Sequence, residues 1–233
     1  DYYFPTAALK IQATDQISIG LLYDQPFGAD ASYSSSSMFT SPLGKTSVEV
    51  DTQNLSLIAG YQPTENWNFY AGPVWQTVEA DINLRGAAYQ GLSGYNIKVH
   101  EEEAFGWLAG FAYQIPEIAL KAAVTYRSEI KHKAKRDESY TFAQATPIAP
   151  NVTAAAGSTI NLNNGSLDAV TPQSVNLDFQ TGIAANTLAF ANIRWAHWDQ
   201  FAVTPKFLNA ASGNNLIDYS DDQWSATVGV GRK

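Results

Sequence analysis

The sequence predicts an all-β protein that crosses a membrane as an antiparallel β-barrel. Three observations lead to this fold class: a shortage of charged residues, side chains that alternate between apolar and small or polar, and connections that alternate between short and long. Of the 233 residues, 45% are hydrophobic and only 15% are charged, whereas globular chains carry about 25% charged residues. This shortage indicates that much of the surface does not face water.

Charge and composition exclude several classes of protein. The 22 acidic and 14 basic side chains give a formal net charge of −8, and without a run of Lys or Arg this balance opposes binding to nucleic acid. The chain has no Cys, which excludes a disulfide framework, a thiol nucleophile and a Cys-ligated metal. No stretch approaches the roughly 18 apolar residues of a membrane-spanning helix, so a helical membrane protein is excluded.

The clearest predicted strand covers residues 118–131. Its even positions are almost all apolar, as expected when one face of a strand meets an apolar environment. Its 14 residues exceed the usual strand of about 5–6 residues and suit a tilted membrane strand of about 9–11 residues that continues beyond the bilayer. The odd positions carry Lys121, Thr125, Arg127, Glu129 and Lys131.

The same alternation recurs along the chain, with one apolar face and one small or polar face. The clearest further segments are 17–23, 55–61, 105–115, 175–183 and 224–230. About nine long strands result, with a short opening segment near residues 6–13. Because bacterial barrels usually close with an even number of strands, we expect a single partial barrel domain over residues 1–233 that belongs to a longer protein.

The connections supply the second pattern. Short turns are predicted at 14–16, 63–66, 116–117 and 185–187, and the long loops between them are predicted near 34–46, 86–102, 135–172 and 204–222. Short turns at one end and long extracellular loops at the other are typical of outer-membrane barrels. A β-sandwich with insertions is the alternative, although sandwich loops have no reason to alternate so regularly.

Catalytic chemistry is not indicated. His100, His132 and His197 lie in separate segments, and the chain contains none of the common catalytic or nucleotide-binding motifs. We therefore expect a protein that is not an enzyme and needs no metal or cofactor.

Cations on the polar face of the predicted strands have two interpretations. A barrel lumen needs such groups paired across strands, so they can form a structural ion network. Alternatively, one cation such as Arg127 receives an anionic headgroup, because the guanidinium offers a bidentate fork to a carboxylate. The predicted network consists of Lys121, Arg127, Glu129, Lys131 and Arg194.

Residues 188–201 place aromatic side chains inside the predicted barrel. Asn192 and Arg194 are poorly suited to lipid, so Phe190 and Trp198, which share their parity, face the interior as well. These rings either pack against a plug or line an apolar path for a ligand.

An early strand is interrupted at Gln25-Pro26-Phe27-Gly28. Pro26 cannot donate to the ladder and Gly28 has no side chain to pack, so the segment marks a bulge, a kink or an edge. An ordinary loop start just outside the membrane is the other interpretation.

Three segments together resemble the long-chain fatty acid transporter (FadL-type) family of the Gram-negative outer membrane. They are Ala122-Ala123-Val124-Thr125-Tyr126-Arg127-Ser128-Glu129-Ile130, Trp195-Ala196-His197-Trp198-Asp199-Gln200-Phe201 and Pro26-Phe27-Gly28. The resemblance implies a monomeric fourteen-stranded barrel with an N-terminal hatch, of which this chain lacks the hatch and the last strands. It further implies that a hydrophobic molecule is caught outside, enters an internal pocket and leaves sideways where an early strand kinks inward.

The resemblance also assigns roles to residues. The lateral opening would fall at Gln25, Pro26, Phe27 and Gly28, and the ligand-binding set would be Phe190, Trp198, Phe201, Arg85 and Arg127. Thr77 and Asp221 stand where some relatives carry Arg or Lys, so neutral hydrocarbons are considered beside fatty acids. The implied partners are this ligand and the lipid or lipopolysaccharide of the bacterial outer membrane.

The main hypothesis is passive, non-enzymatic uptake of long-chain fatty acids or other hydrophobic compounds. One alternative is a secreted β-rich domain for adhesion or carbohydrate binding, which would not need detergent for solubility. The other alternative is a general porin for polar solutes, which a solute-permeability assay would distinguish.

Overall fold

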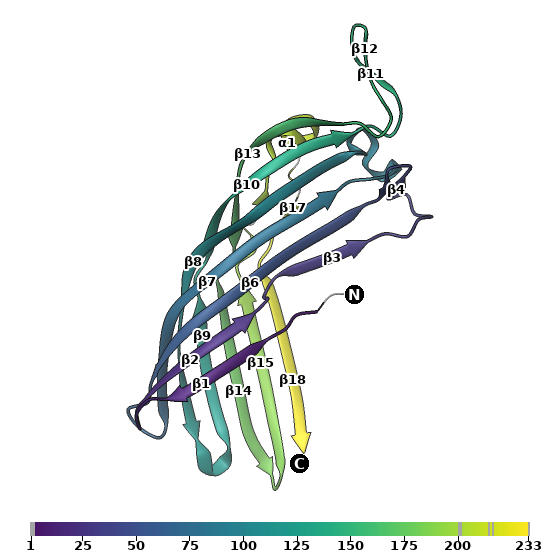
Figure 1. The fold of residues 1–233 in the computed structure, drawn as a ribbon. Coiled ribbons are helices and arrows are strands. Elements are labelled where there is room, and N and C mark those ends of the chain that lie inside the picture. The colour runs from purple at the N-terminus through teal and green to yellow at the C-terminus, as the bar shows by residue number, and fades with distance from the viewer. Residues whose placement is uncertain (1–2, 200–201, 214, 216, 233) are drawn as a thin grey trace.

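The computed structural model describes residues 3–199, 202–213, 215 and 217–232. Most of them belong to one antiparallel sheet that curves around an interior and remains open between its two edge strands (Figure 1). A single curved sheet is the architecture predicted for a membrane barrel, and it argues against a sandwich of two packed sheets. The main path of the sheet follows β1 (Ala7–Gln12), β2 (Ile17–Asp24), β6 (Ser47–Tyr61), β7 (Trp67–Asn83), β8 (Tyr95–Ile115), β9 (Leu120–Arg127), β14 (Ser174–Ala184), β15 (Thr187–Ala196) and β18 (Gln223–Arg232).

Three further strands extend this path. The strand β3 (Gly28–Ser32) continues β2 along β6, β10 (Ile130–Thr141) continues β9, and β13 (Thr159–Thr171) leads into β14. Described strands off the sheet are β4 (Thr40–Ser41), β5 (Gly44–Lys45), β11 (Thr146–Ala149), β12 (Val152–Ala154), β16 (Ala202–Val203) and β17 (Ile217–Asp218). The described helices are η1 (Ala87–Leu92), η2 (Pro116–Ile118) and α1 (Lys206–Ser212). Within the described ranges, none of them has the length and apolar character to span a membrane.

The short connections lie together at one end of the sheet, called here the turn end, and the long connections lie at the other, called the loop end (Figure 1). Two of the short turns use left-handed residues, Ala119 (φ 51°) after β8 and Asn186 (φ 57°) before β15. At the loop end, two of the segments predicted as loops contain long parts of strands. β8 begins at Tyr95, inside the segment 86–102, and β10 and β13 extend far into 135–172.

Two physical reasons explain these extra strands. In β8, two residues, His100 and Glu101, oppose the single residue Glu79 of β7, and such a bulge reverses which side chains point inward. In β10, outward lysines alternate with inward residues of which His132, Arg136 and Glu138 are polar, so no regular apolar period is visible. Strands of this kind cannot be recognised from hydrophobic alternation.

The outward face carries an apolar belt with a sharp upper boundary. In one row across three strands, Leu55 pairs with Trp75, which pairs with Phe105; the Phe105 side chain is 70% exposed. Two residues further toward the loop end, the aligned row is Gln53, Thr77 and Glu103. The Trp75 indole donates a hydrogen bond to Glu103 (2.9 Å) across this boundary, as expected for a ring at a lipid–water interface.

The larger of two buried hydrophobic clusters among the described residues lies at the loop end, inside the extended strands, and the smaller one consists of Val74, Leu108 and Ile130. The members of the larger cluster are Ile82, Leu84, Tyr95, Ile97, Val99, Ala134, Leu167 and Leu208. Because Leu208 belongs to α1, this helix covers the interior from the loop end. Toward the turn end, the inner face instead lines cavities.

Candidate functional site

The predicted strand break is present between β2 and β3. β2 ends at Asp24 and β3 begins at Gly28, so residues 25–27 interrupt the strand, while only two residues of β6 lie opposite these three. The buried hydroxyl of Thr52 accepts a hydrogen bond from the Phe27 amide (3.0 Å) and donates one to the Phe27 carbonyl. The break is therefore a bulge whose freed backbone groups are satisfied by one side chain.

The bulge turns the Phe27 ring toward the interior. The ring lies edge-on to Trp198, with 5.6 Å between the two centroids, and Trp198 also meets Tyr219 at 5.1 Å. Five strands of the sheet separate β2 from β15, so the contact between Phe27 and Trp198 spans the interior. The structure thus joins the strand break and a predicted interior aromatic residue in one aromatic group.

A cavity of about 230 Å³ adjoins Phe27; we call it the upper cavity. Among the described residues that line it, two carry a guanidinium group and one carries a carboxylate. Arg127 Nη2 lies 4.0 Å from Asp24 Oδ2, and Arg194 Nη1 donates a hydrogen bond to Asn176 (3.0 Å). Since two cations face one anion, the cavity carries an excess of positive charge.

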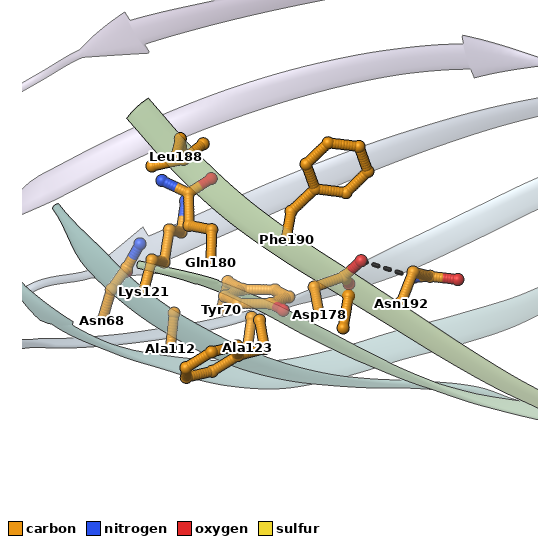
Figure 2. Close-up of a pocket in the computed structure, with 12 residues that line it drawn as sticks. Asn68, Tyr70, Ala112, Lys121, Ala123, Asp178, Gln180, Leu188, Phe190 and Asn192 are labelled. Atoms are coloured by element: carbon orange, nitrogen blue, oxygen red, sulfur yellow. Dashed lines mark hydrogen bonds between the residues drawn. The ribbon is translucent and has the colours of Figure 1, made fainter. Parts of the chain in front are cut away.

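A second cavity, of about 520 Å³, lies nearer the turn end; we call it the lower cavity (Figure 2). Asn192 donates a hydrogen bond to Asp178 (2.5 Å) across its wall, and the Tyr70 hydroxyl is 2.6 Å from the hydroxyl of Thr125. Lys121 and Phe190 also line it. Its lining combines apolar side chains with the charged groups of Lys121 and Asp178, and charged groups oppose the burial of a hydrocarbon chain beside them.

The predicted ion network is divided by the structure. Lys121 lines the lower cavity, whereas Arg127 and Arg194 line the upper one. The prediction that Glu129 and Lys131 face the lumen is wrong, because the interruption between β9 and β10 reverses the alternation. Lys131 is 73% exposed on the outward face and pairs with Glu129 (3.0 Å). Its two neighbours in β10, Ile130 and His132, point inward and are buried.

The remaining ligand-binding candidates occupy different places. Phe190 lies over Gly229, where a Cβ would overlap its ring. Arg85 lies in the loop before β8, and its guanidinium donates to the carbonyls of Leu84 (2.8 Å) and Tyr95 (3.1 Å). Because these loop carbonyls already bind Arg85, we do not include it in the proposed site. Phe201 lies outside the described residues.

A buried polar network, which the sequence analysis missed, borders the upper cavity. Gln76 Oε1 is 2.8 Å from both His132 Nε2 and the Thr171 hydroxyl, and Gln76 Nε2 donates to Asn54 (2.7 Å). Burial lowers the pKa of His132, so the imidazole is favoured in its neutral form. The alternation of His132 with exposed lysines in 131–135 is the signal that could have placed it inside.

A second buried network holds α1 at the loop end. Glu138 pairs with Arg136 inside β10, accepts a hydrogen bond from the Tyr95 hydroxyl (2.8 Å) and accepts another from the Phe207 amide of α1 (3.0 Å). Burial of Arg136 and Glu138 is nearly complete, and such a carboxylate persists only with several partners. Glu138 therefore anchors α1 over the interior.

Comparison with known proteins identifies relatives with this architecture. A long-chain fatty acid transport protein of Salmonella typhi is 24% identical over 98% of this chain and 59% of its own length. The structure of the Pseudomonas putida toluene transporter TodX is 14% identical, with a TM-score of 0.66, over 100% of this chain and 65% of that one. A FadL homologue of Pseudomonas aeruginosa has a TM-score of 0.66 at 16% identity, over 97% of this chain and 56% of that one.

These structures share the fold, and the chain spans about 59% of the length of the curated relative. A family model described as outer membrane protein transport protein (OMPP1/FadL/TodX) matches residues 1–231. The match covers nearly the whole chain and agrees with the curved antiparallel sheet and its outward apolar belt. The chain belongs to this family of outer-membrane transport proteins.

Proposed function

We propose that the chain forms part of a passive, non-enzymatic channel that takes up long-chain fatty acids and releases them sideways at the β2–β3 break. One observation carries this proposal: the Phe27 ring at the break and the guanidinium groups of Arg127 and Arg194 line the same cavity. An apolar chain and an anionic headgroup would therefore find complementary groups within one site.

The excess positive charge of the upper cavity favours a carboxylate ligand. Asp24 can compensate only one of the two guanidinium groups, and at 4.0 Å its contact with Arg127 is loose. Hydrogen bonds to charged groups contribute about 1.5–3 kcal/mol each. A ligand carboxylate between Arg127 and Arg194 would thus gain binding energy that a neutral hydrocarbon cannot.

The apolar part of the ligand would lie against Phe27 and Trp198. Burial of apolar surface contributes about 25 cal/mol per Å², which draws the ligand from the outer surface without an energy source. The charged groups of Lys121 and Asp178 in the lower cavity oppose further movement of an apolar chain toward the turn end. Exit through the wall beside Phe27 lets the ligand avoid these charged groups.

A second candidate ligand is a neutral monoaromatic hydrocarbon. The similar structures include one described as a toluene transporter, and the edge-on pair of Phe27 and Trp198 can accept an aromatic ring. Binding assays with a long-chain fatty acid and with toluene distinguish the two candidate ligands, because only the affinity for the fatty acid should depend on Arg127 and Arg194.

The outward face of the sheet carries an apolar belt and, beyond it, a row of lysines. We propose that the apolar belt faces lipid in a monomer. Beyond the belt boundary, β10 directs Lys131, Lys133 and Lys135 outward, and these ammonium groups would meet the phosphates of lipopolysaccharide.

Straightening the broken strand tests the proposed exit. Pro26→Thr restores a ladder donor, and Gly28→Val adds a side chain whose Cβ lies 2.9 Å from the Phe4 ring. Uptake of a labelled fatty acid by cells should fall, while folding and insertion remain normal. Pro73→Thr, in the unbroken strand β7, is the matched control and should leave uptake unchanged. Uptake at the parental rate in the straightened variant would show that the ligand leaves by another route.

A further inference from the structure

Three metal-ligating side chains meet at the loop end of β15 and β18, outside the cavities described above. His197 and Asp199 follow β15, and Asp222 directly precedes β18. One ligand atom from each, an imidazole nitrogen and two carboxylate oxygens, lies within 4.8 Å of the others. The fold therefore brings together three donors that are up to 25 residues apart in the chain.

The contacts within this group are specific. His197 Nδ1 is 3.0 Å from Asp222 Oδ1, and His197 Nε2 is 3.2 Å from Asp199 Oδ1. The Trp195 indole donates a hydrogen bond to Asp222 Oδ2 (2.8 Å), which leaves Oδ1 of the same carboxylate directed toward the imidazole. A hydrogen bond to the outer oxygen of a carboxylate is the usual way in which proteins orient a metal ligand.

We propose that His197, Asp199 and Asp222 bind one zinc ion at the rim of the interior. A single zinc ion takes one of the two imidazole nitrogens and one oxygen from each carboxylate, and a water molecule completes its tetrahedral coordination. The contact between the other imidazole nitrogen and its carboxylate is given up when the ion binds. Magnesium and calcium prefer ligand sets made only of oxygen, so the imidazole selects a transition metal. The three side chains are each partly exposed, which gives an ion access from outside.

The position of this site links it to the aromatic group. Trp198 lies between two of the ligands in sequence and contacts both Phe27 and Tyr219. A bound ion would join the end of β15 to the start of β18 and so close the connection that includes α1. Because these ligands are brought together only in the folded chain, the ion binds the folded state in preference to the unfolded one, and binding should therefore raise the unfolding temperature.

A zinc titration of the chelator-stripped, detergent-purified protein tests this site. Calorimetry should give one equivalent of zinc per chain, and zinc should raise the midpoint of thermal unfolding. His197→Gln and Asp199→Asn should each weaken binding at least about tenfold and abolish the thermal shift. Circular dichroism before the titration verifies that each variant is folded.

The chain supplies a matched control. His100 Nε2 is 2.8 Å from Asp137 Oδ2 in an exposed pair with a single carboxylate, so His100→Gln should leave zinc binding unchanged. Absence of stoichiometric binding, unchanged binding in His197→Gln, or equal loss in His100→Gln would each overturn the proposal. Calcium binding as tight as zinc binding would also overturn it, because the imidazole would then contribute nothing to selection.

Discussion

The β2–β3 bulge depends on one hydroxyl group, and removing that group is the sharpest test of how the break is held. Thr52→Val keeps the shape of the side chain but leaves the amide and the carbonyl of Phe27 without their partner. An unsatisfied buried backbone group costs about 1–3 kcal/mol. Because the adjoining cavity of about 230 Å³ can admit water to one of the two groups, one group stays unsatisfied, and we expect a loss of about 1–3 kcal/mol in the free energy of unfolding.

The chain contains a matched control for this substitution. The buried hydroxyl of Thr46 donates to the Arg85 carbonyl and accepts from the Arg85 amide, both at 2.9 Å, but does so in the loop before β8. Thr46→Val should therefore cost a similar free energy without affecting the ligand, whereas Thr52→Val should also weaken fatty acid binding because Phe27 is released.

Equilibrium unfolding in denaturant and quenching of tryptophan fluorescence by ligand measure the two effects. A Thr52→Val protein whose free energy of unfolding lies within about 0.5 kcal/mol of the parental value, the usual range for a neutral surface change, would show that the hydroxyl does not hold the bulge. Equal weakening of ligand binding by Thr46→Val would refute the link between the break and the ligand.

Three further predictions concern the wall, the cavity and the core. Val124→Arg, which places a charge on the lipid face, should destabilise the inserted protein by about 2–4 kcal/mol near the bilayer midplane; an unchanged free energy of unfolding would contradict the assigned face. Arg127→Gln or Arg194→Gln should weaken fatty acid binding about tenfold to a hundredfold and leave toluene binding unchanged; an equal effect on both ligands would remove the headgroup assignment. Burial lowers the pKa of His132, so its contribution to stability is complete above the unfolded pKa of about 6.5 and is lost as the pH falls below it. His132→Gln should therefore reduce the loss of stability between pH 7.5 and pH 5, and a loss as large as that of the parent would contradict this assignment.

Hydrophobic alternation predicted the fold where one face of the sheet meets lipid. Around Val124 the outward residues are apolar and the inward residues are polar, so the period of two is visible in the sequence. Beyond the apolar belt, both faces of β10 carry polar groups, and the period disappears. The interruption before Ile130 also reverses the alternation, which is why Lys131 was wrongly assigned to the lumen.

The candidate site was predictable only in part, because its essential contacts join distant segments. Pro26 and Gly28 indicate a break by their own backbone chemistry, and the structure has an interruption there. The approach of Phe27 to Trp198 depends on the curvature of the whole sheet. Likewise, Gln76 gives no sign in the sequence that it would bind His132 and Thr171.

Three interruptions of the sheet surround the upper cavity, and they are not equivalent. Pro26, Ser128 and Pro172, one from each interruption, line the same cavity. The interruption between β9 and β10 lies opposite the interruption between β13 and β14, and ladder pairs continue on both sides of them. The Ser128 amide also donates a hydrogen bond to the Trp107 carbonyl (3.0 Å). Neighbouring strands therefore keep the wall closed there. In contrast, β1 pairs with β2 only as far as Tyr23, and among the described residues no strand pairs with β3 on that side. Opening at Ser128 or Pro172 would break ladder hydrogen bonds on both flanks, whereas on the β1 side of Pro26 no ladder pair between described strands would have to break.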